Sequence, residues 1–295
     1  MNETVGRGTL TVIVPHYNSV GSLKRLIESI PIRDGLEVVV VDDNSSESLE
    51  AISIAYPDVR VLTLPRHRKG GGAARNFGLE NSNSDWLLFA DADDFFVDGA
   101  FDRIYRHLNS DCDVVYFAPT SMKESTGGIG SRHQHYANLL DAYSKTSDKS
   151  LLYKYFVPWS KLVSRRIVDK HSISFDEVIA SNDMNFSLKL ACYGIRHAVD
   201  MSPIYCVTEG DSSLTKQTSL AVLESRFYAA VRYNKFLQDR GEGKYQLGLN
   251  LQLYNMRSLG FAVVMKYLIY SIQSRMPLWR GLKPLARQVL KDMRG

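Results

Sequence analysis

The stretch LEVVVVDDNSS (residues 36–46) decides the fold class, because an unbroken apolar run ends abruptly in polar residues. Strands that are buried on both faces, as in a parallel sheet, have such continuous apolar runs instead of an alternating pattern. Residues 9–15, 59–64 and 86–91 are runs of the same kind. Together the four runs predict neighbouring strands of one parallel sheet.

Segments compatible with helices separate these strands. Residues 22–30 carry apolar side chains at helical spacing, and residues 48–56 and 73–81 separate the later runs. Alternation of strands and helices at this spacing predicts βαβ units in a doubly wound α/β sheet. A helix over residues 100–108 and a fifth strand over residues 113–117 extend the pattern.

The second half of the chain has a less regular pattern. Residues 120–149 are rich in Gly, Ser and mixed charge, which predicts a loop-like segment. A helix is expected near residues 183–193 and a short strand at residues 203–207. Long helical patterns then cover residues 220–237 and 245–272. Helices therefore dominate the last third of the chain.

Composition limits the class of protein. Apolar residues make up 44% and charged residues 23% of the 295 residues, which excludes disordered, collagen-like and coiled-coil proteins. Cys112, Cys192 and Cys206 fit no metal or redox motif and are expected to be thiols of a cytosolic protein. The N-terminus lacks the pattern of a secretory signal. The apolar stretch at residues 259–272 is shorter than the about 20 residues of a spanning helix.

Polar side chains gather where three of the predicted strands end. His16-Tyr17-Asn18 follows the first strand, and residues 42–46 and 91–94 contain five carboxylates. Ligands of open parallel sheets bind at this edge. Carboxylates held close together repel unless a cation lies between them, and oxygen ligands suit Mg²⁺ or Mn²⁺. For residues 42–46, capping of the next helix is the alternative interpretation.

The glycine-rich stretch KGGGAARNFG (residues 69–78) leads into a predicted helix. It matches neither the dinucleotide fingerprint GxGxxG nor the P-loop. A glycine loop before a helix N-terminus, with Arg75 in the first turn, can hold an anion. A flexible turn without a ligand is the alternative.

The motifs TVIVPHYN, VVVVDDNSS, GGGAARNFGL and WLLFADADD, in this order and spacing, resemble those of the family-2 glycosyltransferases of the GT-A fold. The resemblance implies transfer of a sugar from a nucleotide-diphosphate donor with inversion at the anomeric carbon. It implies a GT-A-like, mostly parallel catalytic domain over residues 1–215. The nucleotide-sugar half would span about 1–119 and the acceptor half about 120–215, with a helical extension over 216–295.

The resemblance also implies roles for single residues. Asp91-Ala92-Asp93 matches the DxD motif, in which Asp93 binds Mn²⁺ or Mg²⁺ and Asp91 lies near the ribose and the metal. Arg75 matches the position that reaches the base or the diphosphate, and Asp94 is expected to reach the donor sugar. The donor-binding residues implied in this way are Pro15, Tyr17, Asn18, Asp42, Asp43, Arg75, Asp91, Ala92 and Asp94.

Two motifs in the second half add to the resemblance. PWSKL (residues 158–162) resembles the PWxKL element beside donor sugar and acceptor, which implies contacts by Trp159 and Lys161; for Trp159, simple core packing is the alternative. SNDMNF (residues 181–186) resembles the EDxxF element, whose Asp, here Asp183, is the catalytic base. Asn182 stands where relatives have Glu, and the resemblance implies a place for it beside donor sugar and acceptor.

The family often has a His after the base as a third metal ligand. Residues 208–215 contain no His, so water or diphosphate oxygens are expected to complete the metal shell.

The C-terminal segment is basic. Residues 255–295 hold eight Lys or Arg against Asp292, a net charge of +7, whereas the rest of the chain carries −3. A basic amphipathic segment with Trp279 and a predicted helix at residues 284–293 is typical of binding to an anionic membrane surface. The alternative is a helix packed on the catalytic domain with a solvated basic face. The segment has no nucleic-acid-binding motif, so no nucleic-acid partner is expected.

These observations predict an inverting, metal-dependent glycosyltransferase with a UDP-sugar as the expected donor. By family analogy the acceptor is a glycan, lipid-linked and part of surface polysaccharide (O-antigen, capsule or lipopolysaccharide) synthesis. The expected location is then the inner face of the cytoplasmic membrane. A nucleotidyltransferase acting on a sugar phosphate is the enzymatic alternative, and a non-catalytic nucleotide-sugar-binding protein is the other. The sequence does not indicate the oligomeric state.

Overall fold

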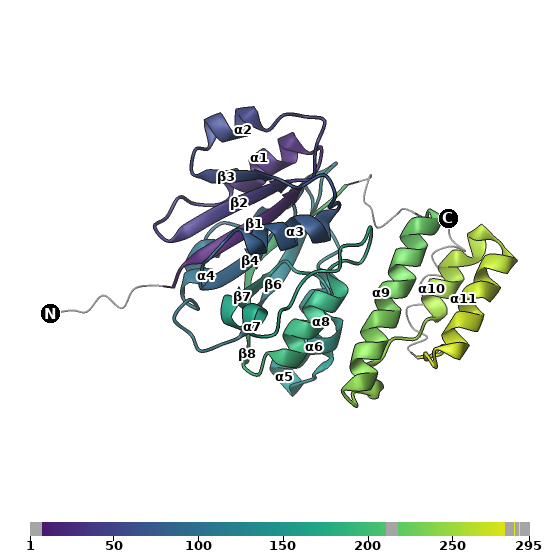
Figure 1. Cartoon of the computed structure of the whole chain (residues 1–295). Helices are drawn as coiled ribbons and strands as arrows, with labels where there is room; N and C mark the ends of the chain where they lie inside the picture. Colours follow the sequence, from purple (N-terminus) through teal and green to yellow (C-terminus); the bar gives the residue numbers. More distant parts are fainter. Residues whose placement is uncertain (1–7, 211–217, 281–285, 287–288, 290–295) are drawn as a thin grey trace. The chain divides into compact units, whose positions relative to one another are not determined.

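The computed structural model describes residues 8–210 and 218–280, together with Ala286 and Val289 (Figure 1). The chain forms two compact units. The first comprises Met1–Glu177 and Phe186–Asp211, and the second comprises Val178–Asn185 and Ser212–Gly295. The helix predicted at residues 284–293 falls outside the continuous described ranges.

One eight-stranded sheet, in the order β3-β2-β1-β4-β7-β6-β8-β5, forms the first unit. The strands are β1 (Leu10–His16), β2 (Leu36–Asp42), β3 (Val59–Thr63), β4 (Trp86–Phe89), β5 (Phe95–Phe96), β6 (Val114–Lys123), β7 (Lys161–Ser164) and β8 (His197–Glu209). Pairing is parallel for β1 with β2 and β4, for β2 with β3, and for β6 with β8. It is antiparallel for β7 with β4 and β6, and for β5 with β8. The predicted mostly parallel α/β sheet is confirmed.

Helices cover both faces of the parallel strands. The helices that precede residue 194 are α1 (Val20–Glu28), α2 (Glu50–Ala55), α3 (Gly71–Glu80), α4 (Ala100–Tyr105), α5 (Gln134–Thr146), α6 (Ser150–Lys154), α7 (Arg165–Lys170) and α8 (Met184–Tyr193). Val38 and Val40 of β2 belong to the large core cluster that includes side chains of α1 and α2. Val39 and Val41 instead pack with Ala73 of α3. Burial on both faces is the reason for the unbroken valine run.

The loop prediction for residues 120–149 is wrong. β6 continues to Lys123, and α5 occupies Gln134–Thr146. The second half of β6 is stabilised by parallel pairing with β8, up to Lys123 opposite Glu209, and α5 packs on β6 and buries Leu140. β8 is also longer than the strand predicted at residues 203–207. Local composition did not show this pairing because the partner strand lies far along the chain.

β7 is a strand that the sequence pattern did not predict. It lies between β4 and β6, antiparallel to both, and all four of its residues are buried. Lys161, which opens the strand, interrupts the apolar pattern from which a buried strand would be recognised.

The second unit contains α9 (Leu220–Asp239), the short 3-10 helices η2 (Gly243–Tyr245) and η3 (Met256–Leu259), α10 (Asn250–Asn255) and α11 (Phe261–Gln273) (Figure 1). The single long helical pattern predicted for residues 245–272 is wrong. Gly260, with a φ of 103°, separates η3 from α11, a conformation that only glycine adopts readily. Side chains around Phe227 and Tyr267 form a separate core. In the described part of the chain no helix has the length and apolar character needed to cross a membrane.

Candidate active site

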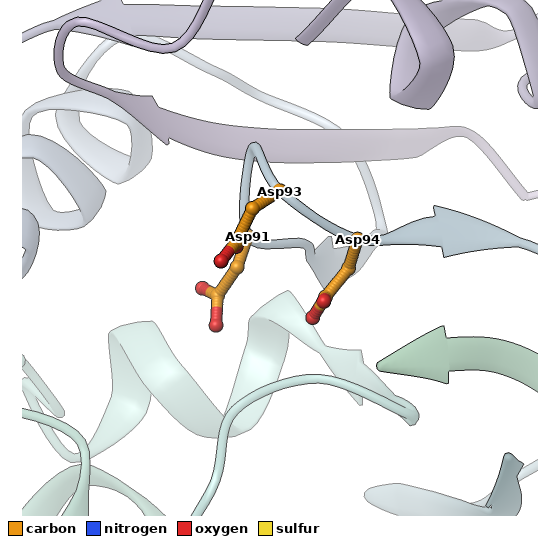
Figure 2. Close-up of side chains that lie close together, drawn as sticks. All are labelled: Asp91, Asp93 and Asp94. Atoms are coloured by element: carbon orange, nitrogen blue, oxygen red, sulfur yellow. The ribbon is translucent and has the colours of Figure 1, made fainter. Parts of the chain in front are cut away.

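Asp91, Asp93 and Asp94 form an acidic turn between β4 and β5, beyond the carboxyl end of β4 (Figure 2). One carboxylate oxygen of each residue lies within 4.8 Å of the others. Figure 2 shows the three side chains projecting from the same side of the turn. An all-oxygen set of this kind suits a hard divalent cation such as Mg²⁺ or Mn²⁺.

The carboxylates of the acidic turn repel one another. Desolvation, and then repulsion by Asp91, raises the pKa of Asp93. Asp94 is buried, and burial followed by repulsion from Asp91 and Asp93 raises its pKa well above the ordinary value. Both shifts show that the ionised carboxylates are costly to hold together here. A bound cation would remove that cost, so the residues fit a divalent metal.

β8 holds the acidic turn in place. The Asp91 N–H donates to the Tyr205 hydroxyl at 2.8 Å, and this hydroxyl also hydrogen-bonds with the Asp94 carboxylate. The Thr208 N–H donates to Asp94 Oδ1 at 2.7 Å. Asp94 therefore joins the turn to β8, and a contact from its buried carboxylate to the donor sugar stays a prediction. Neither Tyr205 nor Thr208 was a candidate from the sequence, because only the β5–β8 pairing brings them here.

Arg75 of α3 lies beside the acidic turn. Its Nη2 donates to Asp91 Oδ1, and its guanidinium lies 5.4 Å from the centre of the Phe175 ring. The neighbouring Asn76 accepts from the Phe175 N–H at 2.8 Å and donates to Glu177 Oε1 at 3.0 Å. The glycine-loop helix thus joins the DxD turn to the segment FDE at residues 175–177.

Two arginines that the sequence did not single out also face the acidic turn. Arg25 of α1 donates through Nη2 to the Asp93 carbonyl oxygen at 2.5 Å and to Thr208 Oγ1 at 3.1 Å. Arg132 donates to the Thr208 carbonyl oxygen at 3.3 Å. Both cations oppose the rise in the pKa of Asp93, so they lie within electrostatic reach of its carboxylate. Such contacts join segments that lie far apart in the chain, so the sequence pattern around either arginine does not indicate them.

The ends of β1 and β2 are joined by hydrogen bonds around Asp42. The buried His16 accepts from the Ser19 N–H at Nε2, over 3.1 Å, and its Nδ1 lies 3.0 Å from Asp42 Oδ1. This network assigns the neutral tautomer with the proton on Nδ1. Asp42 also accepts from the Ser45 N–H at 3.1 Å. Asp42 therefore fixes the loop after β2, and its role in binding the donor stays a prediction.

The other nucleoside-pocket candidates lie around the same loops. Asp43 accepts from the Gly70 N–H at 2.8 Å, which ties the end of β2 to the glycine loop. Asn18, at a positive φ of 47°, accepts from the Ser46 N–H at 2.8 Å. Tyr17 is 57% exposed, so its ring is accessible for stacking on a base. Pro15 belongs to β1, and Ala92 is buried in the acidic turn.

Trp159 and Lys161 lie in the core. Trp159 is buried and stacks on Tyr205, with ring centres 5.7 Å apart. The Lys161 ammonium donates to the Tyr155 carbonyl oxygen at 2.7 Å and to Ser187 Oγ at 2.9 Å. In this conformation Trp159 supports the residue that holds the acidic turn. A donor-sugar or acceptor contact by either side chain stays a prediction.

Asp183 and Asn182 precede α8 and belong to the second compact unit, and both are half-buried. The role of Asp183 as catalytic base and the place of Asn182 beside the sugars stay predictions. Residues 211–215, part of the segment in which relatives carry a third metal ligand, lie outside the described residues. The described Glu209 accepts from the Arg132 N–H at 2.6 Å.

A doubly wound, mostly parallel sheet with a DxD turn beyond a strand end, beside a glycine-loop helix and its arginine, defines the GT-A class of glycosyltransferase folds. Residues 11–172 match the family description "Glycosyl transferase family 2", and the chain belongs to this family.

Comparisons with individual proteins agree with this assignment. The succinoglycan biosynthesis protein ExoO of Rhizobium meliloti is 30% identical over 220 residues, which are 69% of this chain and 62% of ExoO. S. aureus TarS, solved with UDP-GlcNAc, superimposes with a TM-score of 0.64 at 20% identity, covering 85% of this chain and 73% of that one. The mannosyltransferase PcManGT from Pyrobaculum calidifontis, solved with GDP-Man and Mn²⁺, gives 0.57 at 16% identity, covering 98% and 81%. The two structures share the fold of this chain.

Proposed function

We propose that this protein transfers a sugar from a nucleotide-diphosphate donor to a hydroxyl group of a glycan acceptor, with inversion at the anomeric carbon. The observation that carries the proposal is the acidic turn, with three carboxylates in reach of one cation and Arg75 beside them. The TarS structure with UDP-GlcNAc supports a UDP-sugar as the donor. The PcManGT structure with GDP-Man and Mn²⁺ supports a donor–metal site in this fold.

In this proposal Asp93 and Asp91 hold Mn²⁺ or Mg²⁺. A bound cation supplies neutralisation of the charge that develops on the departing diphosphate. Arg75 adds a fixed positive charge beside Asp91, and Arg132 is an exposed cation close to Asp93. We assign the diphosphate to a position beside Arg75 and Arg132, because guanidinium groups pair well with phosphate oxygens.

The nucleoside lies in this proposal against the loops after β1 and β2. The exposed Tyr17 ring offers a stacking surface. Asn18 and Asp43 hold the neighbouring loops by accepting hydrogen bonds from the N–H groups of Ser46 and Gly70. Asp42 contributes by fixing the loop through His16 and Ser45.

Asp183 is the proposed general base. Inverting transfer is an in-line displacement, so it needs one group that takes the proton of the acceptor hydroxyl. The neutral Asn182 beside it adds no like charge, which leaves the pKa of the base less raised than a Glu–Asp pair would.

The proposed acceptor is a lipid-linked glycan of a bacterial surface polysaccharide. Its support is the similarity to ExoO, a protein named for succinoglycan biosynthesis. A lipid-linked acceptor would bring the enzyme to the inner face of the cytoplasmic membrane.

A thermal-shift panel tests the proposal. UDP-sugars and GDP-sugars are added with and without Mn²⁺, and the melting temperature of the full chain is measured. A ligand that binds only the folded state raises stability by mass action, so the correct donor should raise the melting temperature in the presence of metal. Stabilisation by a nucleoside triphosphate would instead support the nucleotidyltransferase, provided that adding a sugar phosphate then releases pyrophosphate. No shift with any nucleotide sugar would contradict the proposal.

Arg25→Ala is expected to weaken Mn²⁺ binding by about 10–100-fold, the usual effect of removing a partner that orients a metal ligand. The reason is that Arg25 holds the main chain of Asp93 and the side chain of Thr208. Mn²⁺ titration by calorimetry measures the loss. Lys24→Ala, an exposed neighbour on the same helix, is the matched control and should leave the affinity unchanged. Equal Mn²⁺ affinity for Arg25→Ala and wild type would refute this positioning role.

A further inference from the structure

The outward face of α11 is apolar. Phe261, Met265, Ile269 and Ile272 follow one another at helical spacing, and Phe261 and Ile272 are 80% and 60% exposed. Tyr267, on the other side of the helix, is buried in the core of the second unit. A helix of a globular protein normally turns polar residues to solvent, so this face lacks the pattern of a solvated surface.

Trp279 is a further exposed apolar side chain, on a segment that follows α11 and is held in place. The carbonyl oxygens of Pro277 and Leu278 accept from the N–H groups of Leu249 and Asn250, at 3.0 and 3.1 Å. These hydrogen bonds hold the chain after α11 against the start of α10. Trp279 is nevertheless 73% exposed. Four large apolar side chains thus stand in solvent within residues 261–279, whereas the exposed apolar residues of the first unit are scattered along its sequence.

The stretch of sequence that carries this face is basic. From residue 243 to residue 291 the sequence contains eight Lys or Arg and no Asp or Glu. Glu224 of α9 contacts α11, where it pairs with Lys266 at 3.8 Å and accepts a hydrogen bond from Tyr267. A second copy of the chain docked on the same face would bring two basic surfaces together, which costs energy. An anionic surface with an apolar interior has the complementary chemistry.

We propose that α11 and Trp279 form a membrane-docking face that inserts into the headgroup region of an anionic bilayer. The helix would lie in the plane of the interface, with Phe261, Ile269 and Ile272 toward the acyl chains and the basic residues near the headgroups. This inference concerns the second unit alone and does not depend on the transfer activity. The basic C-terminal sequence predicted a membrane contact, and the proposal names the side chains that would make it.

Vesicle co-sedimentation of the full chain tests the face. The vesicles consist of phosphatidylcholine alone or mixed with phosphatidylglycerol. Wild type should bind the anionic vesicles, and the triple variant F261S/I269S/I272S should bind them at least about tenfold more weakly, because three exposed apolar side chains no longer enter the bilayer. The double variant I32S/I195S, which removes apolar residues of the first unit that are at least as exposed, is the matched control and should bind like wild type.

Tryptophan fluorescence reports insertion directly. Trp86 and Trp159 are buried, so a brominated acyl chain can quench only Trp279 among the three tryptophans. Quenching by brominated anionic vesicles is expected for wild type and should disappear in Trp279→Phe, which keeps an aromatic ring and therefore most of the binding. High salt should weaken binding, since it screens the attraction between basic residues and headgroups.

Three results would overturn the proposal. The first is no binding of wild type to anionic vesicles at low salt. The second is equal binding by F261S/I269S/I272S and wild type. The third is self-association of wild type in light scattering that the triple variant abolishes, which would make this face a contact between copies. If a donor still raises the melting temperature of the triple variant, its fold and its donor site are intact. Loss of vesicle binding in that variant then concerns the docking face and not the proposed function.

Discussion

The Asp93→Ala protein is expected to lose metal-stimulated sugar transfer by about 10³-fold or more, because it removes a proposed ligand of the cation that would neutralise the departing diphosphate. The fold should persist, since the carbonyl oxygen of residue 93, which Arg25 contacts, remains in the variant. The raised pKa of Asp93 also means that its ionised form destabilises the folded state at neutral pH. Without metal, the variant should therefore melt at the same temperature as wild type or slightly higher.

Two measurements separate these effects. Transfer is measured across a range of Mn²⁺ concentrations, and melting temperature is measured with metal and donor present or absent. Asp98→Ala, which removes an exposed carboxylate four residues after Asp94, is the matched control and should behave like wild type. Mn²⁺-stimulated turnover near the wild-type level in Asp93→Ala would show that the metal assignment is wrong.

Asp183→Asn should lower the rate of transfer by about 10²–10⁴-fold, the usual contribution of a general base. The substitution keeps the shape of the side chain and removes the proton acceptor. Donor affinity should barely change, because the proposed base acts on the acceptor hydroxyl. The rate at saturating donor and acceptor, together with the Kd of the nucleotide sugar, checks both parts of this expectation.

Asp239→Asn, at the exposed end of α9, is the control for Asp183→Asn. Asn182→Glu supplies a second readout, since the added like charge should raise the pKa of the base and move the acidic limb of the pH–rate profile to higher pH. Loss of donor binding in Asp183→Asn with turnover preserved at saturating donor would reverse the proposed roles.

The parallel half of the fold could be predicted from local sequence. The apolar run that forms β2 directly reflects burial on both faces of the sheet, because Val40 packs on one face and Val41 on the other. The acidic turn could be recognised for a related reason. Residues 91–94 follow a buried strand immediately, so they had to lie at the edge of the sheet where ligands of this fold class bind.

The contacts that complete the candidate site depend on pairing between distant segments. Tyr205 and Thr208 reach Asp91 and Asp94 because β8 pairs with both β5 and β6, and Arg25 reaches the Asp93 carbonyl oxygen from α1. No periodicity in the sequence encodes a partner so far along the chain. The structure buries Trp159 and Lys161 in the core, which agrees with the alternative given for Trp159, and their contacts to donor sugar and acceptor stay predictions.

The sequence by itself determined the doubly wound sheet, the family and the acidic turn, because hydrophobic periodicity and short motifs are local properties of the chain. Only the tertiary structure decided which cations face that turn, that residues 120–123 extend a strand, and that the apolar side of α11 points outward. The physical reason is that strand register and helix orientation are fixed by packing between distant segments. The same Phe, Ile and Trp side chains could equally have been buried in the core of the second unit.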